Sequence, residues 1–447
     1  MTALVLGIVG LNLVFALVGW ALLHGLGRRL SVADAGLALV LGTGVAGTGV
    51  FLAVIAGARA NLRTLAVVCV AIALAAGAAR GRRLRHGRVE RPDVGVAAAA
   101  LLGVVAAVCA LAVVGGFRSS PWLDDAWGIW LPKGVTLLHR GLDTRVFAPS
   151  DVFVSFEVLD YPLWWSSITA LDVRAVGSID LRALNAQLGL LSVGFVGAVA
   201  VLLWGRVRPW LIGGTLALVV ASPEFFRHSQ GGVADLALAI YLSLATLCAV
   251  VWLAEGDALL LVLAALFGAV AVQVKTEGLA ELLVLLAVGV AAGAAYAPAR
   301  ARRLAVAGLV SAATALPWLV WRAVHDVDAR VPLTRALDPT YLADRADRVG
   351  PAARSLTRHV VDPTEWLLLV PLLLVVCAVG AWRHRRVLWL APAAAVGALY
   401  VFLVWAYWAD RDPISFVLAT SAYRVVDPLV LSAAVLLPLA AERVLRR

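Results

Sequence analysis

The sequence carries little charge for its length. Asp, Glu, Lys and Arg make up 15% of the 447 residues, whereas apolar residues make up 62% and the mean hydropathy is +0.92. A soluble domain does not need that much apolar surface, and apolar runs of about eighteen or more residues are typical of membrane spans. The composition therefore argues against a soluble protein and predicts an all-α, polytopic membrane protein.

Cysteines are also few, and the nucleotide-binding phosphate loop is absent from the sequence. The four cysteines, Cys69, Cys109, Cys248 and Cys377, lie far apart inside apolar runs, without the spacing of a disulfide framework or a metal site. No G-x-x-x-x-G-K-[ST] phosphate loop occurs, which argues against a pump powered by nucleotides. The N-terminus lacks the basic region of a cleavable signal peptide, so we expect its first apolar run to span the membrane.

The apolar runs predict about thirteen transmembrane helices. They cover residues 3–25, 34–57, 63–79, 95–116, 183–204, 209–222, 233–254, 258–274, 278–297, 304–321, 365–382, 387–408 and 425–441. Arginine clusters follow alternate helices, at residues 28–29, 80–91, 206–208, 300–303, 383–386 and 443–447. The positive-inside rule then places the N-terminus outside and the C-terminus in the cytoplasm. Because the composition is typical of a GC-rich bacterial genome, we expect the bacterial cytoplasmic membrane.

Two long polar segments fall on the predicted external side, at residues 117–182 and 322–364. Their proline and charged residues predict short interfacial helices and loops. We divide the chain into residues 1–95, a three-helix segment with a cytoplasmic loop, and residues 96–447, which contain both external segments. The net charge of +10 is explained by the arginine-rich loops, so we expect the lipid bilayer, and no nucleic acid, as a partner.

The first external segment begins with paired carboxylates. Asp124 and Asp125 stand just beyond a predicted span, among tryptophans that include Trp127, at the depth that tryptophan prefers. One interpretation is an N-cap for the flat interfacial helix that the spacing of residues 127–138 predicts. The other is a carboxylate at the membrane surface, where partial desolvation raises its basicity and lets it act as a general base.

The two lysines of the chain both lie near carboxylates on the predicted external face. Lys133 follows the paired carboxylates, and Lys275 begins Lys275-Thr276-Glu277-Gly278 between two spans. The other 36 of the 38 basic residues are arginines. A lysine therefore suggests that its position requires a compact ammonium group, for example as a phosphate ligand. With only two cases, chance is the alternative.

Further polar positions follow on the same side. Asp160-Tyr161-Pro162 lies in the first external segment, and His228 and Asp235 flank the turn before the seventh span. Asp235 either stabilises the start of its helix or contacts a ligand. Arg424, just before the last span, either reaches to the lipid headgroups or binds a phosphate through its guanidinium fork.

These motifs together resemble the GT-C superfamily of membrane glycosyltransferases, within it the bacterial relatives of protein O-mannosyltransferases and aminoarabinose transferases. The resemblance runs from about residue 117 onward and includes Asp125-Ala126-Trp127, Tyr161-Pro162-Leu163, Gly232-Val233-Ala234-Asp235, Lys275-Thr276-Glu277-Gly278 and Thr420-Ser421-Ala422-Tyr423-Arg424. One departure is that four predicted helices precede the acidic loop, where the family usually has one.

The resemblance implies inverting transfer of a sugar from a polyprenyl-phosphate donor to an extracytoplasmic glycolipid, cell-wall glycan or protein. The residues it implicates are Asp125 or Asp124 as general base, Lys275, Arg424 and Lys133 for the donor phosphate, and Glu277, Asp235, Tyr161, Trp127 and His228 for sugar or acceptor. No cofactor is certain, although Asp124, Asp125 and Glu277 could hold a divalent metal ion. A transporter or lipid flippase is the main alternative, and a non-catalytic scaffold is the other.

Overall fold

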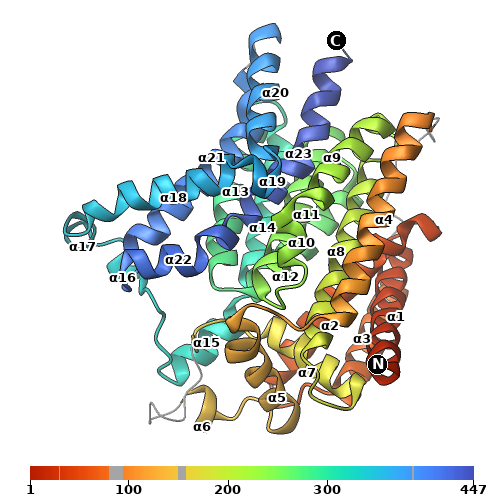
Figure 1. Cartoon of the computed structure of the whole chain (residues 1–447), viewed down its shortest axis with the longest axis vertical. Coiled ribbons are helices and arrows are strands. Elements are labelled where there is room, and N and C mark those ends of the chain that lie inside the picture. The colour runs from red at the N-terminus through yellow and green to blue at the C-terminus, as the bar shows by residue number, and fades with distance from the viewer. Residues whose placement is uncertain (30, 80–93, 149–157, 385–386, 447) are drawn as a thin grey trace.

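The computed structural model describes residues 1–29, 31–79, 94–148, 158–384 and 387–446 (Figure 1). The described chain is helical, and its one β-bridge joins Trp204 and Val207. The expected arginine cluster at residues 80–91 lies outside the described residues, as do Arg385 and Arg386.

Ten of the described helices, counting some broken ones as single spans, are long and apolar enough to cross a membrane. They are α1 (Thr2–Gly25), α2 (Ala35–Ile55, with η1 at Val32–Asp34), α3 (Leu62–Ala79), α4 (Val96–Arg118), α8 (Arg182–Leu203), α11 (Ala234–Glu255), α13 (Glu277–Ala294), α14 and α15 (Pro298–Ala313 and Leu316–Val324), α21 (Ala391–Ala409), and α22 and α23 (Ile414–Val425 and Asp427–Leu445). Three shorter apolar helices, α9 (Pro209–Ala221), α12 (Ala258–Val274) and α20 (Leu369–His384), coincide with the remaining expected spans. The prediction of an all-α, polytopic membrane protein is confirmed at this level.

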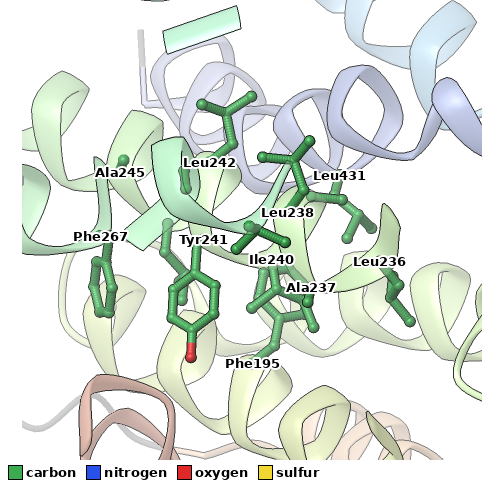
Figure 2. Close-up of a cluster of buried hydrophobic side chains, with 14 of the residues drawn as sticks. Phe195, Leu236, Ala237, Leu238, Ile240, Tyr241, Leu242, Ala245, Phe267 and Leu431 are labelled. Carbon is green, nitrogen blue, oxygen red and sulfur yellow. The ribbon is translucent and has the colours of Figure 1, made fainter. Parts of the chain in front are cut away.

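Helix α11 forms the centre of the bundle. It is apolar on every side, and nearly all of its residues are buried between α8, α12, α13 and α23. Figure 2 shows Tyr241 of α11 among aliphatic side chains, with Phe195 and Phe267 nearby. The Tyr241 hydroxyl donates a hydrogen bond of 3.1 Å to the carbonyl of Val40 in α2, so the central helix is tied to the N-terminal segment.

The helices on either side of residue 95 share a buried interface. At Gly36 of α2, an added Cβ would lie 2.8 Å from the backbone of Gly194 in α8, which only a glycine permits. Small residues let membrane helices approach this closely. Nearby, Asn12 of α1 and Gln187 of α8 exchange two amide hydrogen bonds, of 2.7 and 3.2 Å.

The two external segments contain the expected short helices. In the first, η2 (Ala126–Trp130) and α5 (Leu131–His139) coincide with the predicted interfacial helix, and α6 (Thr144–Phe147) follows. Between α9 and α11 lies the short α10 (Pro223–His228). In the second segment the helices are α16 (Leu333–Ala336), α17 (Pro339–Ala343), η4 (Ala346–Arg348) and α18 (Val349–Val361), with α19 (Pro363–Trp366) next; η5 (Val387–Leu390) precedes α21.

One buried helix, α7 (Trp164–Val176), was not expected. Its sequence is too short and too polar to resemble a span, yet most of its residues are buried against α1, α2, α5 and α8. The hydroxyls of Ser167 and Thr169 bond the backbone carbonyls four residues earlier, at 2.8 and 3.0 Å. Hydropathy alone missed this helix because several of its buried residues are polar. Ser167 and Thr169 are satisfied within the helix, whereas both oxygens of Asp172 are buried without a hydrogen-bond partner among the described residues.

Several arginine-bearing turns meet at one end of the bundle. Arg206 forms an ion pair of 2.8 Å with Glu255 at the end of α11, and Arg208 lies 3.4 Å from Glu442 of α23. Arg446 donates to the carbonyl of Arg206 at 3.2 Å. The chain termini lie toward opposite ends of the molecule in Figure 1. Which end faces the cytoplasm stays a prediction.

Candidate active site

Six side chains from distant parts of the chain form a polar cluster. Its members are Asp125, Tyr161, Asp235, Lys275, Glu277 and Arg424. They come from the residue before η2, the segment before α7, the first turn of α11, the turn between α12 and α13 (Lys275), the start of α13 (Glu277) and the last turn of α22. All six were singled out in the sequence, and the fold brings them together.

Arg424 joins two of the carboxylates. Its Nη2 lies 2.6 Å from Oδ2 of Asp125, and its Nη1 lies 4.0 Å from Oδ2 of Asp235. The residue is 8% exposed, so the guanidinium faces inward and does not extend to lipid headgroups. The snorkelling alternative for Arg424 therefore does not describe this structure.

Lys275 holds the opposite side of Asp235. Its Nζ lies 2.9 Å from Oδ1 of Asp235 and 3.7 Å from Oε1 of Glu277. Burial alone would lower the pKa of Lys275, but the two carboxylates raise it well above its ordinary value. The lysine is therefore a permanent cation in this cluster, which suits an electrostatic role and excludes it as a general base near neutral pH.

Tyr161 forms an aromatic wall beside the lysine. Its hydroxyl donates to Oε1 of Glu277 at 3.4 Å, and its ring stacks on Trp130 with centroids 5.6 Å apart. The Nζ of Lys275 lies 5.1 Å from the centre of the Tyr161 ring. Burial and the nearby Glu277 raise the pKa of Tyr161, so the hydroxyl keeps its proton.

Several buried atoms of the cluster have no hydrogen-bond partner among the described residues. They are Oδ2 of Asp235, Oε2 of Glu277, and Nε and Nη1 of Arg424. Leaving a buried polar atom unpaired costs about 1–3 kcal/mol, and more for a charged group. The cluster thus offers unpaired carboxylate acceptors and unpaired guanidinium donors, which suit a polar ligand that carries hydroxyls and an anionic group.

The cluster distinguishes the two adjacent aspartates. Asp125 faces Arg424, whereas Asp124 is exposed and accepts the backbone N–H of Asp125 at 3.1 Å. Neither Asp125 nor Asp235 caps a helix through its side chain. Trp127 is 54% exposed and lies outside the cluster contacts described above.

Two other expected ligand residues are turned into the protein. Lys133 is fully buried, and its Nζ donates to the carbonyl of Val158 at 2.6 Å. His228 is 1% exposed, with Nδ1 2.9 Å from Asp427 and Nε2 3.1 Å from Glu224. This geometry leaves neither residue available to a phosphate or a sugar, so their expected binding roles find no support in it.

His228 instead links α10 to α23. Burial alone would lower its pKa, but the carboxylates of Asp427 and Glu224 raise it to about 9. A protonated imidazole therefore bridges two buried carboxylates, and Asp427 is only three residues from Arg424. The arrangement fixes the α22–α23 junction that carries the arginine.

The sequence analysis missed Asp427, Glu224 and a third acid, Glu281. Glu281 lies one helical turn after Glu277, is 2% exposed and has an unpartnered Oε2. The spacing of four residues could have drawn attention to it, because residues four apart share one helix face. Asp427 and Glu224 gave no comparable signal, since each looks like an ordinary helix-end acid.

A divalent metal site is not formed by the expected residues. Among the described residues, no three His, Cys, Asp or Glu side chains gather as a metal would require, so Asp124, Asp125 and Glu277 do not constitute one. A cavity of about 530 Å³ lies elsewhere in the bundle, between α11, α13, α14 and α23, and includes no residue of the polar cluster.

We compared the chain with models of known protein families, with curated proteins and with solved structures, and none of them matched. The membrane-helical architecture and the polar cluster are therefore the observations from which a function has to be argued.

Proposed function

We propose that the chain is a GT-C-like glycosyltransferase with thirteen spans in a bacterial cytoplasmic membrane. It would transfer a sugar from a polyprenyl-phosphate donor to an acceptor hydroxyl on the extracytoplasmic side. The observation that carries the proposal is the contact of Asp125 with Arg424 beside Asp235 and Lys275. These four residues supply a base and two cations where a phosphate leaving group needs them.

The proposed reaction is a single displacement. The acceptor hydroxyl attacks the anomeric carbon as the bond from that carbon to the phosphate oxygen breaks, and Asp125 takes the hydroxyl proton. Arg424 and Lys275 stabilise the negative charge that develops on the phosphate. The sugar configuration inverts, and no covalent enzyme intermediate forms.

The Asp125–Arg424 ion pair gives this mechanism an order of events. While the two are 2.6 Å apart, the guanidinium occupies the carboxylate in an ion pair. A donor phosphate that binds Arg424 would compete for its donors and release Asp125. The base would thus become active only when the donor is in place.

Glu277, Asp235 and Tyr161 would contact sugar and acceptor hydroxyls. Two of the three present unpartnered oxygens within the cluster, and Tyr161 offers a protonated hydroxyl beside them. An aromatic face such as the Tyr161–Trp130 stack would suit the apolar side of a sugar ring.

Transport is the second candidate, because two buried carboxylates have no part in the proposed transfer reaction. Glu281 of α13 has one unpartnered oxygen, and Asp172 of α7 has both oxygens unpartnered at 0% exposure. Buried ionisable groups of this kind are common on substrate and proton paths. A transporter would need these two residues, whereas the glycosyltransferase would need Asp125.

The test is sugar transfer by the purified protein from radiolabelled polyprenyl-phosphate hexoses and pentoses to membrane acceptors. Asp125→Asn should abolish transfer and retain donor binding, whereas Lys275→Ala should weaken donor binding as well. Asp124→Asn is the matched control, since it removes the neighbouring exposed carboxylate. Transfer that survives Asp125→Asn, or uptake of a sugar substrate by proteoliposomes that depends on Glu281, would contradict the proposal.

A further inference from the structure

A second polar site lies where three separate segments converge. A hollow of about 510 Å³ is lined by the α2–α3 turn, the end of α5 and the end of α7. Its basic residues are Arg59, Arg63, His139 and Arg174; we call the hollow the basic pocket. Its size falls within the range of about 300–1,000 Å³ that ligand sites usually have.

The positive charge of this pocket is not neutralised within the protein. No Asp or Glu among the described residues lines it. Within the described part of the chain, none of its four basic side chains makes a hydrogen bond or an ion pair. Arg59, Arg63 and Arg174 are exposed and line one hollow, so an anion that enters it is attracted by three positive charges at once.

The walls of the basic pocket are held in place by backbone contacts. The N–H of Ala60 donates to the carbonyl of Leu137 at 3.1 Å, which fastens the α2–α3 turn to α5. Asn61 caps α3 by accepting the N–H groups of Arg63 and Thr64 at 3.0 and 3.1 Å. Gly177, with φ of +80°, ends α7 beside the pocket. A site built in advance loses less ordering entropy when a ligand binds.

The neighbouring residues indicate where the pocket lies relative to the bilayer. Leu62 and Ile179, at its rim, are 41% and 61% exposed, as side chains at a bilayer surface are. Helices α5 and α7 lie at the end of the molecule that bears the N-terminus in Figure 1. In the predicted topology this is the external end, where the positive-inside rule gives no reason for arginines.

We propose that the basic pocket binds a phosphodiester group of net negative charge from the external side, carried by a lipid headgroup or by a phosphorylated glycan. Guanidinium forks bind phosphate oxygens in pairs, which suits Arg59, Arg63 and Arg174 around one group. Asn61 and Ser178 also line the pocket, so the Asn61 amide N–H groups and the Ser178 hydroxyl would be the contacts for the neutral part of the same ligand. This site is separate from the polar cluster and does not depend on the proposed transfer reaction.

The experiment uses the full-length protein in nanodiscs with equal amounts of phosphatidylglycerol and phosphatidylcholine. Native mass spectrometry of the released protein measures which lipid it retains, and titration with glycerophosphoglycerol tests the soluble phosphodiester. We expect Arg59→Gln with Arg174→Gln to weaken phosphodiester binding at least about tenfold, because charge-assisted bonds are lost. Arg354→Gln, at an exposed arginine of α18, is the matched control and should bind like the wild type.

The lipid-retention measurement and the titration together identify which molecule carries the phosphodiester group. Binding of both probes supports a free phosphodiester ligand, and retention of phosphatidylglycerol alone supports a lipid headgroup. Arg59→Lys with Arg174→Lys keeps the charge without the forks and should bind with intermediate affinity if the variants fold, which thermal unfolding checks. The proposal is overturned if the wild type retains phosphatidylglycerol no better than zwitterionic phosphatidylcholine and binds glycerophosphoglycerol no better than glycerol, or if the glutamine variant binds like Arg354→Gln.

Discussion

The two ends of the molecule use ion pairs in different ways. At the end that bears the arginine turns, Arg206 and Glu255 pair at the surface, with side chains 15% and 41% exposed. In the polar cluster, Lys275 and Asp235 pair with side chains only 7% and 5% exposed. The first kind of pair costs little and contributes little, whereas the second keeps charges in a poorly solvated place.

The difference in exposure matches a difference in role, because one set of charges orients the chain in the membrane and the other forms the candidate active site. Exposed arginines at helix ends serve orientation in the membrane, and any of them can be replaced by another cation nearby. A buried cluster in which Asp235 is shared by Lys275 and Arg424 cannot be rearranged so easily, because each removal leaves a charge unpaired. Substitutions at the two ends should therefore have effects of different size.

The largest effect is expected on turnover. Asp125→Asn keeps the shape of the side chain but removes the proton acceptor, so sugar transfer should fall about 10²- to 10⁴-fold. Asp124→Asn should stay near wild type, because Asp124 does not face Arg424. Steady-state transfer assays on both purified variants measure the contrast, and equal losses would remove the distinction between the two aspartates.

The next effect is on stability. Lys275→Ala removes the cation at 2.9 Å from buried Asp235 and leaves Arg424 at 4.0 Å, so the free energy of unfolding should fall by about 3–5 kcal/mol. Denaturant unfolding in micelles, followed by tryptophan fluorescence, measures the change. A loss below about 1 kcal/mol would mean that water reaches the Lys275–Asp235 pair and that this pair is solvated like the Arg206–Glu255 pair.

A pH effect should follow from His228. Its pKa is raised to about 9 in the folded protein, from the usual value near 6.5, so its protonation stabilises the fold. That contribution is complete below about pH 6.5 and is lost as the pH rises through 9. The melting temperature should therefore decline over this window, and His228→Gln should flatten the decline. An unchanged slope in the variant would assign the pH dependence to another group.

The smallest effect is expected at the arginine end. Arg206→Gln should change the free energy of unfolding by only about 0–1 kcal/mol, because its pair with Glu255 is solvated. The same denaturant titration as for Lys275→Ala gives a direct comparison. A loss as large as that of Lys275→Ala would show that exposure does not separate the two kinds of pair.

Much of the architecture could be predicted, because a membrane span is a local property. The apolar length of α1, α4 or α11 is enough to make each a membrane helix, whatever its neighbours are. Helix α7 could not be predicted in this way, because its burial depends on helices α1, α2 and α8 covering it. The same holds for the break between α14 and α15, which a single apolar run conceals.

The candidate site was predictable in its membership but not in its geometry. Scarce lysines and carboxylates at predicted span ends pointed to Lys275, Asp235 and Asp125. Nothing local, however, distinguishes His228 from a ligand residue, because its partner Asp427 lies 199 positions away. The roles of Lys133 and His228 as internal contacts emerged only from the fold.

The sequence by itself determined that this chain is a membrane protein of many helices with its chemistry-bearing residues at span ends. Transfer free energy acts on each apolar run separately, so composition and spacing suffice for that. Only the tertiary structure decided that Asp125 and not Asp124 meets Arg424, and that His228 turns inward. Such pairings depend on the directions of side chains from segments far apart, and electrostatic energy changes steeply with those few ångströms.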